Sequence, residues 1–240
     1  MEDIQKKLTL GFLVVLLIAF LAYLGRVKVK HDHHQCDRVR LVARVGVFGA
    51  LSAILYIVPI FQIKLLFLPS FLELHFDEIP AFLAGFAYGP VAGALVILIK
   101  TILKLPFTST LCVGELSDLI YSLAFVVPAS IVYEKKRNLK GVAQGLLLST
   151  MLQLIVSVVT NIYIMLPFYM NVMGLPYDLI LGWCQAANPN VTNLEWGYGL
   201  LCVLPLNLIK DAIVIVVTFF VYRHIHTFLR FEKPSKSPSK

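Results

Sequence analysis

The stretch DEIPAFLAGFAYGPVAGALVILIK, residues 77–100, is the part of the sequence that decides the fold. Its charged residues stand only at its two ends, and everything between them is apolar or small. Two apolar runs, about 78–88 and 90–105, meet at Gly89-Pro90, where the proline suits the first turn of a new helix. The pattern predicts two short apolar helices joined by a tight turn.

The composition of the whole chain extends this reading to a membrane protein. Of the 240 residues, 58% are hydrophobic and 15% are charged, against about 45–50% and about 25% in an average soluble domain. So little charge cannot cover a soluble surface, which argues against a cytosolic enzyme, a nucleic-acid-binding protein and a disordered chain. We expect the lipid bilayer to be the main surroundings of the chain, and no nucleic acid among its partners.

Further apolar runs on both sides of this stretch predict the other membrane spans. A spanning helix needs about 20 apolar residues. The other runs lie at about 8–24, 40–60, 113–133, 142–168 and 199–222. The fold class expected is therefore an all-α integral membrane protein, with six spans from residue 40 onward and one extra N-terminal transmembrane helix.

Basic residues predict how these spans are oriented. They gather at 26–44, at 135–140 and at 223–240, each next to an apolar run. Positive charge marks cytoplasmic segments, so these three are expected inside, and 61–77 and 169–198 outside. Six basic residues follow the run at 8–24, whereas only Lys6 and Lys7 directly precede it, which favours an uncleaved first helix with residue 1 outside.

The chain then divides into three parts. Residues 1–39 are expected to hold the extra helix and a basic cytoplasmic linker, and 40–230 the six-helix core. Residues 231–240 form a tail of Lys, Ser and Pro with a Phe and a Glu, which is expected to be disordered.

Polar residues gather at one depth of the expected bundle. Ionisable groups in membrane spans are costly and rarely face lipid, so a shared depth indicates a shared role. Those at the outer ends of several helices are Asp77, Glu78, Lys100, Lys104, Glu115, Asp118, Asn161, Asn207, Lys210 and Asp211. They predict an outward-facing pocket for a small polar molecule rather than a path across the membrane. Another interpretation, favoured for Asp77, Glu78 and Lys104, is that they pair or reach the interface.

Small residues form a second pattern, in the run 40–60. Gly46 and Ala50 are four residues apart, and so are Gly49 and Ala53. Such spacing lets two helices approach closely. The pairs therefore pack inside this protein or dock it onto another membrane subunit.

Sequence motifs for catalysis are missing. The chain has no nucleotide-binding P-loop, no H-E-x-x-H and no G-x-S-x-G. The four cysteines, Cys36, Cys112, Cys184 and Cys202, have no metal-site spacing, and we interpret them as unpaired. We expect no enzyme activity, no metal and no cofactor.

The quoted stretch, followed by Val113-Gly114-Glu115-Leu116-x-Asp118, resembles the substrate-binding S components of energy-coupling-factor (ECF) vitamin transporters. The resemblance covers about 40–230. Asn161 before Leu166-Pro167, and the run 204–210 with Asn207 and Lys210, look most like the riboflavin-specific branch.

The resemblance implies a function, partners and a site. It implies a riboflavin-binding, multi-pass subunit of a bacterial plasma membrane, which takes up the vitamin outside and docks on a transmembrane T subunit driven by two cytoplasmic ATPases. Helix 40–60 would dock through one of its small-residue pairs. The expected ligand contacts, which include neighbours that could line the pocket, are Asn161, Asn207, Lys210, Phe71, Leu72, Glu115 and Lys100. Tyr163 and Leu204 could add apolar walls.

Two alternatives stay open from the sequence. The helix at 8–24 is extra to the family pattern, and the external segment 169–198 is long and carries Trp183 and Trp196. Another heterocyclic vitamin, such as a folate or a pyridoxine-like compound, is therefore open as ligand. A lipid-modifying membrane enzyme would need an acidic cluster for Mg²⁺ at the cytoplasmic face, where the loops are basic.

Overall fold

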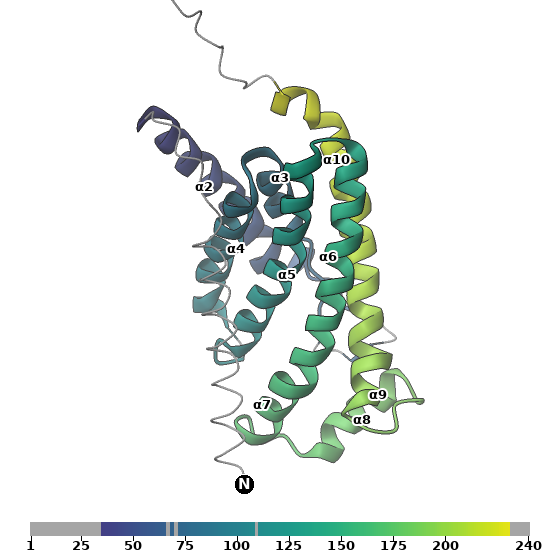
Figure 1. Ribbon diagram of the computed structural model, residues 1–240. Coiled ribbons are helices and arrows are strands. Elements are labelled where there is room, and N and C mark those ends of the chain that lie inside the picture. The colour runs from purple at the N-terminus through teal and green to yellow at the C-terminus, as the bar shows by residue number, and fades with distance from the viewer. Residues whose placement is uncertain (1–34, 66–67, 70–71, 109, 231–240) are drawn as a thin grey trace, which may run out of the picture.

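The computed structural model describes residues 35–230 apart from 66–67, 70–71 and 109. The apolar run at 8–24 and the C-terminal tail from 231 lie outside the described residues. The described part is built from helices (Figure 1), and within it β pairing is limited to one isolated antiparallel bridge between Ile63 and Leu74.

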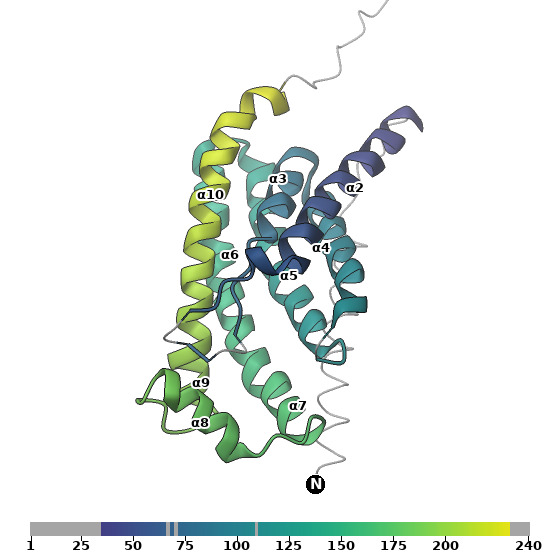
Figure 2. The ribbon, with the colours of Figure 1, turned by 180° about the vertical axis from the view of Figure 1, so that it is seen from behind.

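The helices follow one another with mostly short connections, and the longest connection lies between η1 and α3. They are α2 (Gln35–Ile57), η1 (Pro59–Phe61), α3 (Glu78–Tyr88), α4 (Pro90–Lys104), η2 (Leu105–Phe107), α5 (Val113–Lys136), α6 (Leu139–Thr160), η3 (Asn161–Met165), α7 (Leu166–Asn171), α8 (Tyr177–Ala187), α9 (Trp196–Tyr198), η4 (Gly199–Val203) and α10 (Leu204–Arg230). The segment between η1 and α3 runs across the bundle toward α10 (Figure 2).

Four helical segments of the described chain are long and apolar enough to cross a membrane. They are Pro90–Phe107, Val113–Lys136, Leu139–Asn171 and Trp196–His224. The apolar part of α2, Leu41–Ile57, is shorter, and α3 has only 11 residues. The all-helical membrane fold is thus present, whereas α3 is well below the about 20 residues that a spanning helix needs.

The turn between α3 and α4 has the chemistry that the sequence predicts. Gly89 has a φ of +100°, a conformation that glycine adopts without strain, and its amide donates to the carbonyl of Gly85. Pro90 then starts α4. A Cβ on Gly93 would lie 3.1 Å from the carbonyl oxygen of Ala81, so the two helices touch backbone to backbone.

The apolar interior falls into two clusters, one toward each end of the bundle. The first contains Phe82, Phe86 and Phe125 and joins α3, α4 and α5. The second contains Ile180 of α8, Tyr198 of α9 and Val203 of η4, at the end where α7, α8 and α9 lie together in Figure 1. The polar residues that could form a site lie between these two packed regions.

The two longest helical segments, Leu139–Asn171 and Trp196–His224, each contain a π-helical turn. In η3 the amide of Leu166 donates to the carbonyl of Asn161, and in η4 the amide of Leu204 donates to that of Gly199. Each bond spans five residues instead of four. Such turns occur frequently at functional sites, and the two here lie against each other, since a Cβ on Gly199 would be 2.7 Å from Ile162.

The two small-residue pairs of α2 lie on different faces of that helix. Gly49 and Ala53 are buried, and a Cβ on Gly49 would lie 2.7 Å from the Ile99 side chain of α4. Gly46 and Ala50 are exposed, with no neighbour within 4 Å of a Cβ built on Gly46. Gly49 and Ala53 therefore pack inside the protein, and Gly46 with Ala50 is the pair left open to a partner.

Candidate functional site

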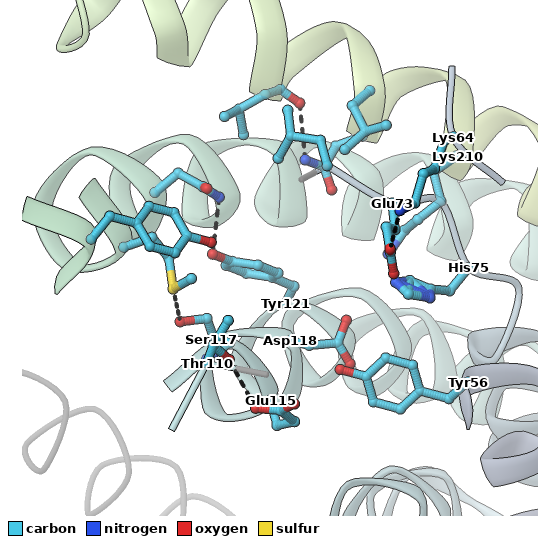
Figure 3. A pocket seen from close by; sticks show the side chains of 18 of the residues that line it. Tyr56, Lys64, Glu73, His75, Thr110, Glu115, Ser117, Asp118, Tyr121 and Lys210 are labelled. Carbon is cyan, nitrogen blue, oxygen red and sulfur yellow. Dashed lines mark hydrogen bonds and ion pairs between the residues drawn. The ribbon is translucent and has the colours of Figure 1, made fainter. Parts of the chain in front are cut away.

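A cavity of about 550 Å³ lies between the two packed regions (Figure 3). Its size falls within the range of about 300–1,000 Å³ typical of small-molecule sites. Side chains from α2, the following segment, the end of α4, α5, η3, α7, α8, η4 and α10 surround it. Aromatic and apolar residues that line it are Tyr56, Leu72, Tyr121, Met165, Tyr169, Met173, Leu175, Ile180, Trp183, Val203 and Leu206.

The start of α5 supplies one polar wall. Gly114, Asp118 and Tyr121 recur at helical spacing and therefore share a face, which lines the cavity together with Glu115. Glu115 accepts hydrogen bonds from Thr108 (2.8 Å) and Thr110 (3.1 Å) of the preceding loop. These bonds hold a buried carboxylate in a defined position at the cavity edge.

Asn161 opens the π turn η3 and has an amide with partners on three sides. Its Nδ2 donates to the Tyr121 hydroxyl (3.0 Å) and to the Ser157 carbonyl (2.9 Å), and its Oδ1 accepts from the Tyr198 hydroxyl (3.1 Å). The side chain is 7% exposed and lines the cavity. It is thus oriented by α5 and α9 before any ligand binds.

Asn207 is held in a similar way on α10. Its Oδ1 accepts from Gln153 of α6 (2.8 Å), and its Nδ2 donates to the carbonyl of Val203 (2.9 Å). A primary amide has two N–H donors and an oxygen with two lone pairs. In the structure one donor and one lone pair of Asn207 are used, which leaves one of each for a molecule in the cavity.

Beside the cavity lies a buried ion network that joins four helices. Lys100 of α4 pairs with Asp77 and with Asp118 (2.9 Å), and it donates to the Ser122 hydroxyl (2.9 Å). Lys210 of α10 pairs with Glu78 of α3. A buried charge is stable only when it is paired and hydrogen-bonded. The interpretation that Asp77 and Glu78 pair with cations therefore describes this part of the structure.

The network also reaches α2. Ser52 is fully buried and donates its hydroxyl hydrogen to the backbone carbonyl of Asp77, the residue that holds Lys100. On the other side, Asp118 and Lys210 line the cavity. The charged cluster is thus a physical link between α2 and the cavity wall.

The structure brings most of the residues proposed from the sequence together. The cavity lining includes Leu72, Glu115, Asn161, Asn207 and Lys210. Phe71 lies outside the described residues.

Lys100, expected from the sequence to contact the ligand, is a member of the buried ion network. It lies outside the cavity lining, and its three N–H donors are taken by Asp77, Asp118 and Ser122. Tyr163 and Leu204 also lie outside the lining, and the Tyr163 side chain is 56% exposed. Lys104, treated in the sequence as an interface residue, does line the cavity, with its ammonium 5.1 Å from the centre of the Tyr56 ring.

Sequence reasoning missed the aromatic residues of the cavity. Tyr56 continues the buried stripe of α2 set by Gly49 and Ala53, and Tyr121 follows Asp118 by three residues. Helical periodicity could have found both. His75 and Tyr169 carry no such signal, because their position depends on how an irregular segment and a π turn place them.

His75 lies in the segment between η1 and α3 and is a neutral member of the lining. Burial lowers the pKa of its imidazole from its ordinary value to about 4. Its ring meets that of Tyr56 edge to face, with 5.0 Å between the centroids. The uncharged ring thus adds flat surface to a wall that already holds aromatic side chains.

The arrangement suits binding of a flat polar molecule. Aromatic and aliphatic walls can hold a planar ring, and the asparagines, Lys210 and Glu115 offer oriented donors and acceptors. Among the described residues there is no group of three or more His, Cys, Asp or Glu side chains that could hold a metal ion. The fold and the cavity together define a membrane-embedded, small-molecule-binding protein.

Comparison with known proteins places the chain within this class. The family model described as "ECF transporter, substrate-specific component" matches residues 40–222. The chain belongs to this family of bacterial membrane proteins. The family is a transporter component rather than an enzyme family.

Individual relatives and a solved structure agree with this assignment. The chain is 29% identical to the riboflavin transporter RibU of Staphylococcus aureus, over 78% of this chain and 92% of that protein. It is 27% identical to the riboflavin transporter FmnP of Bacillus subtilis, over 75% and 90%. It also matches a structure reported as the S component of a bacterial ECF transporter, with a TM-score of 0.62 and 25% identity, over 80% of this chain and 99% of the other.

Proposed function

We propose that the protein is the riboflavin-binding S component of an ECF importer, and that the vitamin occupies the cavity between α5, η3 and α10. The observation that carries the proposal is the cavity itself, in which Asn161 and Asn207 are held in place by side-chain and backbone hydrogen bonds. The similarity to proteins named riboflavin transporters supports this ligand over other vitamins.

Riboflavin and the cavity have matching chemistry. The flavin is a planar apolar ring with one polar edge of carbonyls and ring nitrogens, and it carries a polyhydroxy chain. In the proposed arrangement the aromatic walls cover the ring, and the amides of Asn161 and Asn207 bind the polar edge. Lys210 and Glu115 are the residues proposed to bind the remaining polar groups. Leu72 and the neighbouring Phe71 would cover the ligand from the segment between η1 and α3.

Binding of riboflavin to the purified protein tests this function. Protein purified in detergent should carry a yellow chromophore with a flavin spectrum, and the stripped protein should quench riboflavin fluorescence on titration. A folate and a pyridoxine-like compound should compete weakly in the same titration. Absence of quenching by folded wild-type protein would reject riboflavin as the ligand.

The partner proposal extends this function to active uptake. The protein is proposed to dock on a transmembrane T subunit that is driven by two cytoplasmic ATPases, with six helices from residue 40 and a seventh at 8–24. The basic segments then lie on the cytoplasmic side, in line with the positive-inside rule. Labelling of single cysteines at positions 5 and 32 in whole cells tests the orientation, with external labelling expected at 5 only.

Docking is expected to depend on the exposed small pair of α2. Replacing Ala50 or Gly46 by leucine should abolish co-purification with the T subunit and leave the affinity for riboflavin unchanged, because a bulky side chain keeps two helices apart. The matched control is Gly49→Leu, which forces a side chain into Ile99 and should lower thermal stability instead. Intact complexes with both Gly46→Leu and Ala50→Leu would show that α2 docks through another face.

A further inference from the structure

Two buried cysteines come together at the end of the molecule that holds α8. Cys184 lies in α8 and Cys202 in η4, and each is 0% exposed. The two thiols interact with each other. Both belong to the same apolar cluster as Ile180, Tyr198 and Val203.

Each of the two cysteines lies next to a residue that lines the cavity. Ile180 and Trp183, the latter next to Cys184, are cavity-lining residues of α8. Val203, which follows Cys202, lines the cavity from η4. A covalent bond between the two sulfurs would therefore join two walls of the cavity that are otherwise held together by packing.

The expected side of the membrane is compatible with a disulfide. By the charge pattern, 169–198 faces the outside of the cell, where disulfides persist. The two cysteines are 18 residues apart in the sequence. A disulfide between them would close this loop and disfavour conformations in which α8 has moved away from η4. Cys112 precedes α5 and belongs to neither apolar cluster.

We propose that Cys184 and Cys202 are a redox-active dithiol, whose disulfide form fastens α8 to η4, directly before α10, and slows exchange of the ligand. The oxidant is a disulfide of a small thiol. One protein thiolate attacks it, forming a mixed disulfide and releasing one small thiol, and the second thiolate then displaces the other. The Sγ–Sγ bond forms and the S–S bond of the oxidant breaks. Two electrons and the two thiol protons pass to the oxidant.

The burial of both sulfurs gives the reaction a conformational requirement. An oxidant in solution reaches them only when α8 separates from the α9–η4 segment. A molecule that fills the cavity contacts Trp183 and Val203 and holds this end closed. Oxidation of the dithiol should therefore be slower in the presence of riboflavin, a part of the inference that rests on the proposed function.

Peptide mapping tests the disulfide without reference to any ligand. Full-length protein carrying Cys36→Ser and Cys112→Ser is incubated in detergent with oxidised glutathione, and its free thiols are then alkylated. The protein is digested with chymotrypsin, which cleaves after Trp196 and Tyr198 and so separates the two cysteines into different peptides. The expected product is a linked peptide pair that separates on reduction. Cys184→Ala is the control that should give none. Free or only glutathione-bound thiols after this treatment would reject the proposal.

The rate of riboflavin release tests the consequence for the cavity. In the same background, dissociation from the oxidised protein should be slower by about tenfold than from the reduced protein, as expected when a site is held in its bound form. Dithiothreitol should restore the faster rate, and the Cys184→Ala variant should not respond to either reagent. If the disulfide formed but the release rate did not change, the bond would be structural only, and the proposal that it slows ligand exchange would be rejected.

Discussion

Replacing Lys100 by methionine is expected to lower the free energy of unfolding by about 3–5 kcal/mol, because removal of one partner leaves buried carboxylates without a cation. Asp77 is completely buried, and Lys100 is its ion-pair partner. The same ammonium also holds Asp118 and Ser122. Thermal and denaturant unfolding of the ligand-free protein in detergent would measure the loss.

A second lysine of the chain provides a matched control for this substitution. Lys64 pairs with Glu73 at 3.2 Å, but its side chain is 58% exposed, and exposed pairs contribute about 0–1 kcal/mol. Lys64→Met should thus unfold close to wild type. Adding Asp77→Asn to Lys100→Met should recover part of the stability. If Lys100→Met unfolded like Lys64→Met and lost only riboflavin affinity, Lys100 would be a ligand contact after all.

The affinity for riboflavin is expected to fall by roughly tenfold to a hundredfold in Asn161→Ala and in Asn207→Ala. Each substitution removes an amide that lines the cavity, and a polar group of the ligand left unpaired costs about 1–3 kcal/mol. Titration by quenching of flavin fluorescence measures the change. Thermal unfolding without ligand is needed beside it, because Asn207→Ala also removes the acceptor of Gln153.

Tyr163 is the internal control for this experiment. It is two residues from Asn161 in the same π turn, yet it is exposed and outside the lining, so Tyr163→Ala should bind as wild type does. Lys210→Ala is a less direct test, because it leaves Glu78 buried without its partner and should reduce both stability and affinity. Unchanged affinity in both asparagine variants would move the ligand away from η3 and α10.

Most of the fold follows from features that the sequence displays directly. Hydrophobic length and the Gly89-Pro90 junction predict the long apolar helices and the turn between α3 and α4. The expectation of full spans at 78–88 and 40–60 is less well matched, because α3 is only 11 residues long and the apolar part of α2 is Leu41–Ile57. Hydropathy reports how apolar a run is, but not whether neighbouring helices cover it.

The site could be predicted only in part, for a different physical reason. Depth along a helix is readable from sequence, which predicts that Asn161, Asn207 and Lys210 lie near one another. Lys100 and Lys104 are one turn apart on the same face of α4, and their ammonium groups lie 4.8 and 5.1 Å from the centre of the Tyr56 ring. Which of them is held in the ion network and which lines the cavity is decided by the neighbouring helices, whose packing the sequence does not display. The contributions of His75 and Tyr169 needed the tertiary structure.

The two π turns make chain length itself a determinant of ligand recognition. Residues four apart in a regular α-helix drift around the axis by about 40° at each step, so a stripe such as Gln153, Ser157, Asn161 and Met165 would gradually leave one face. The wider turn at η3 offsets that drift, and all four side chains stay buried. Deleting one residue from η3 or η4 would rotate everything beyond it by about 100°. Two proteins with the same ligand-contacting residues could therefore differ in specificity because one of them lacks a single residue of a π turn that does not itself contact the ligand.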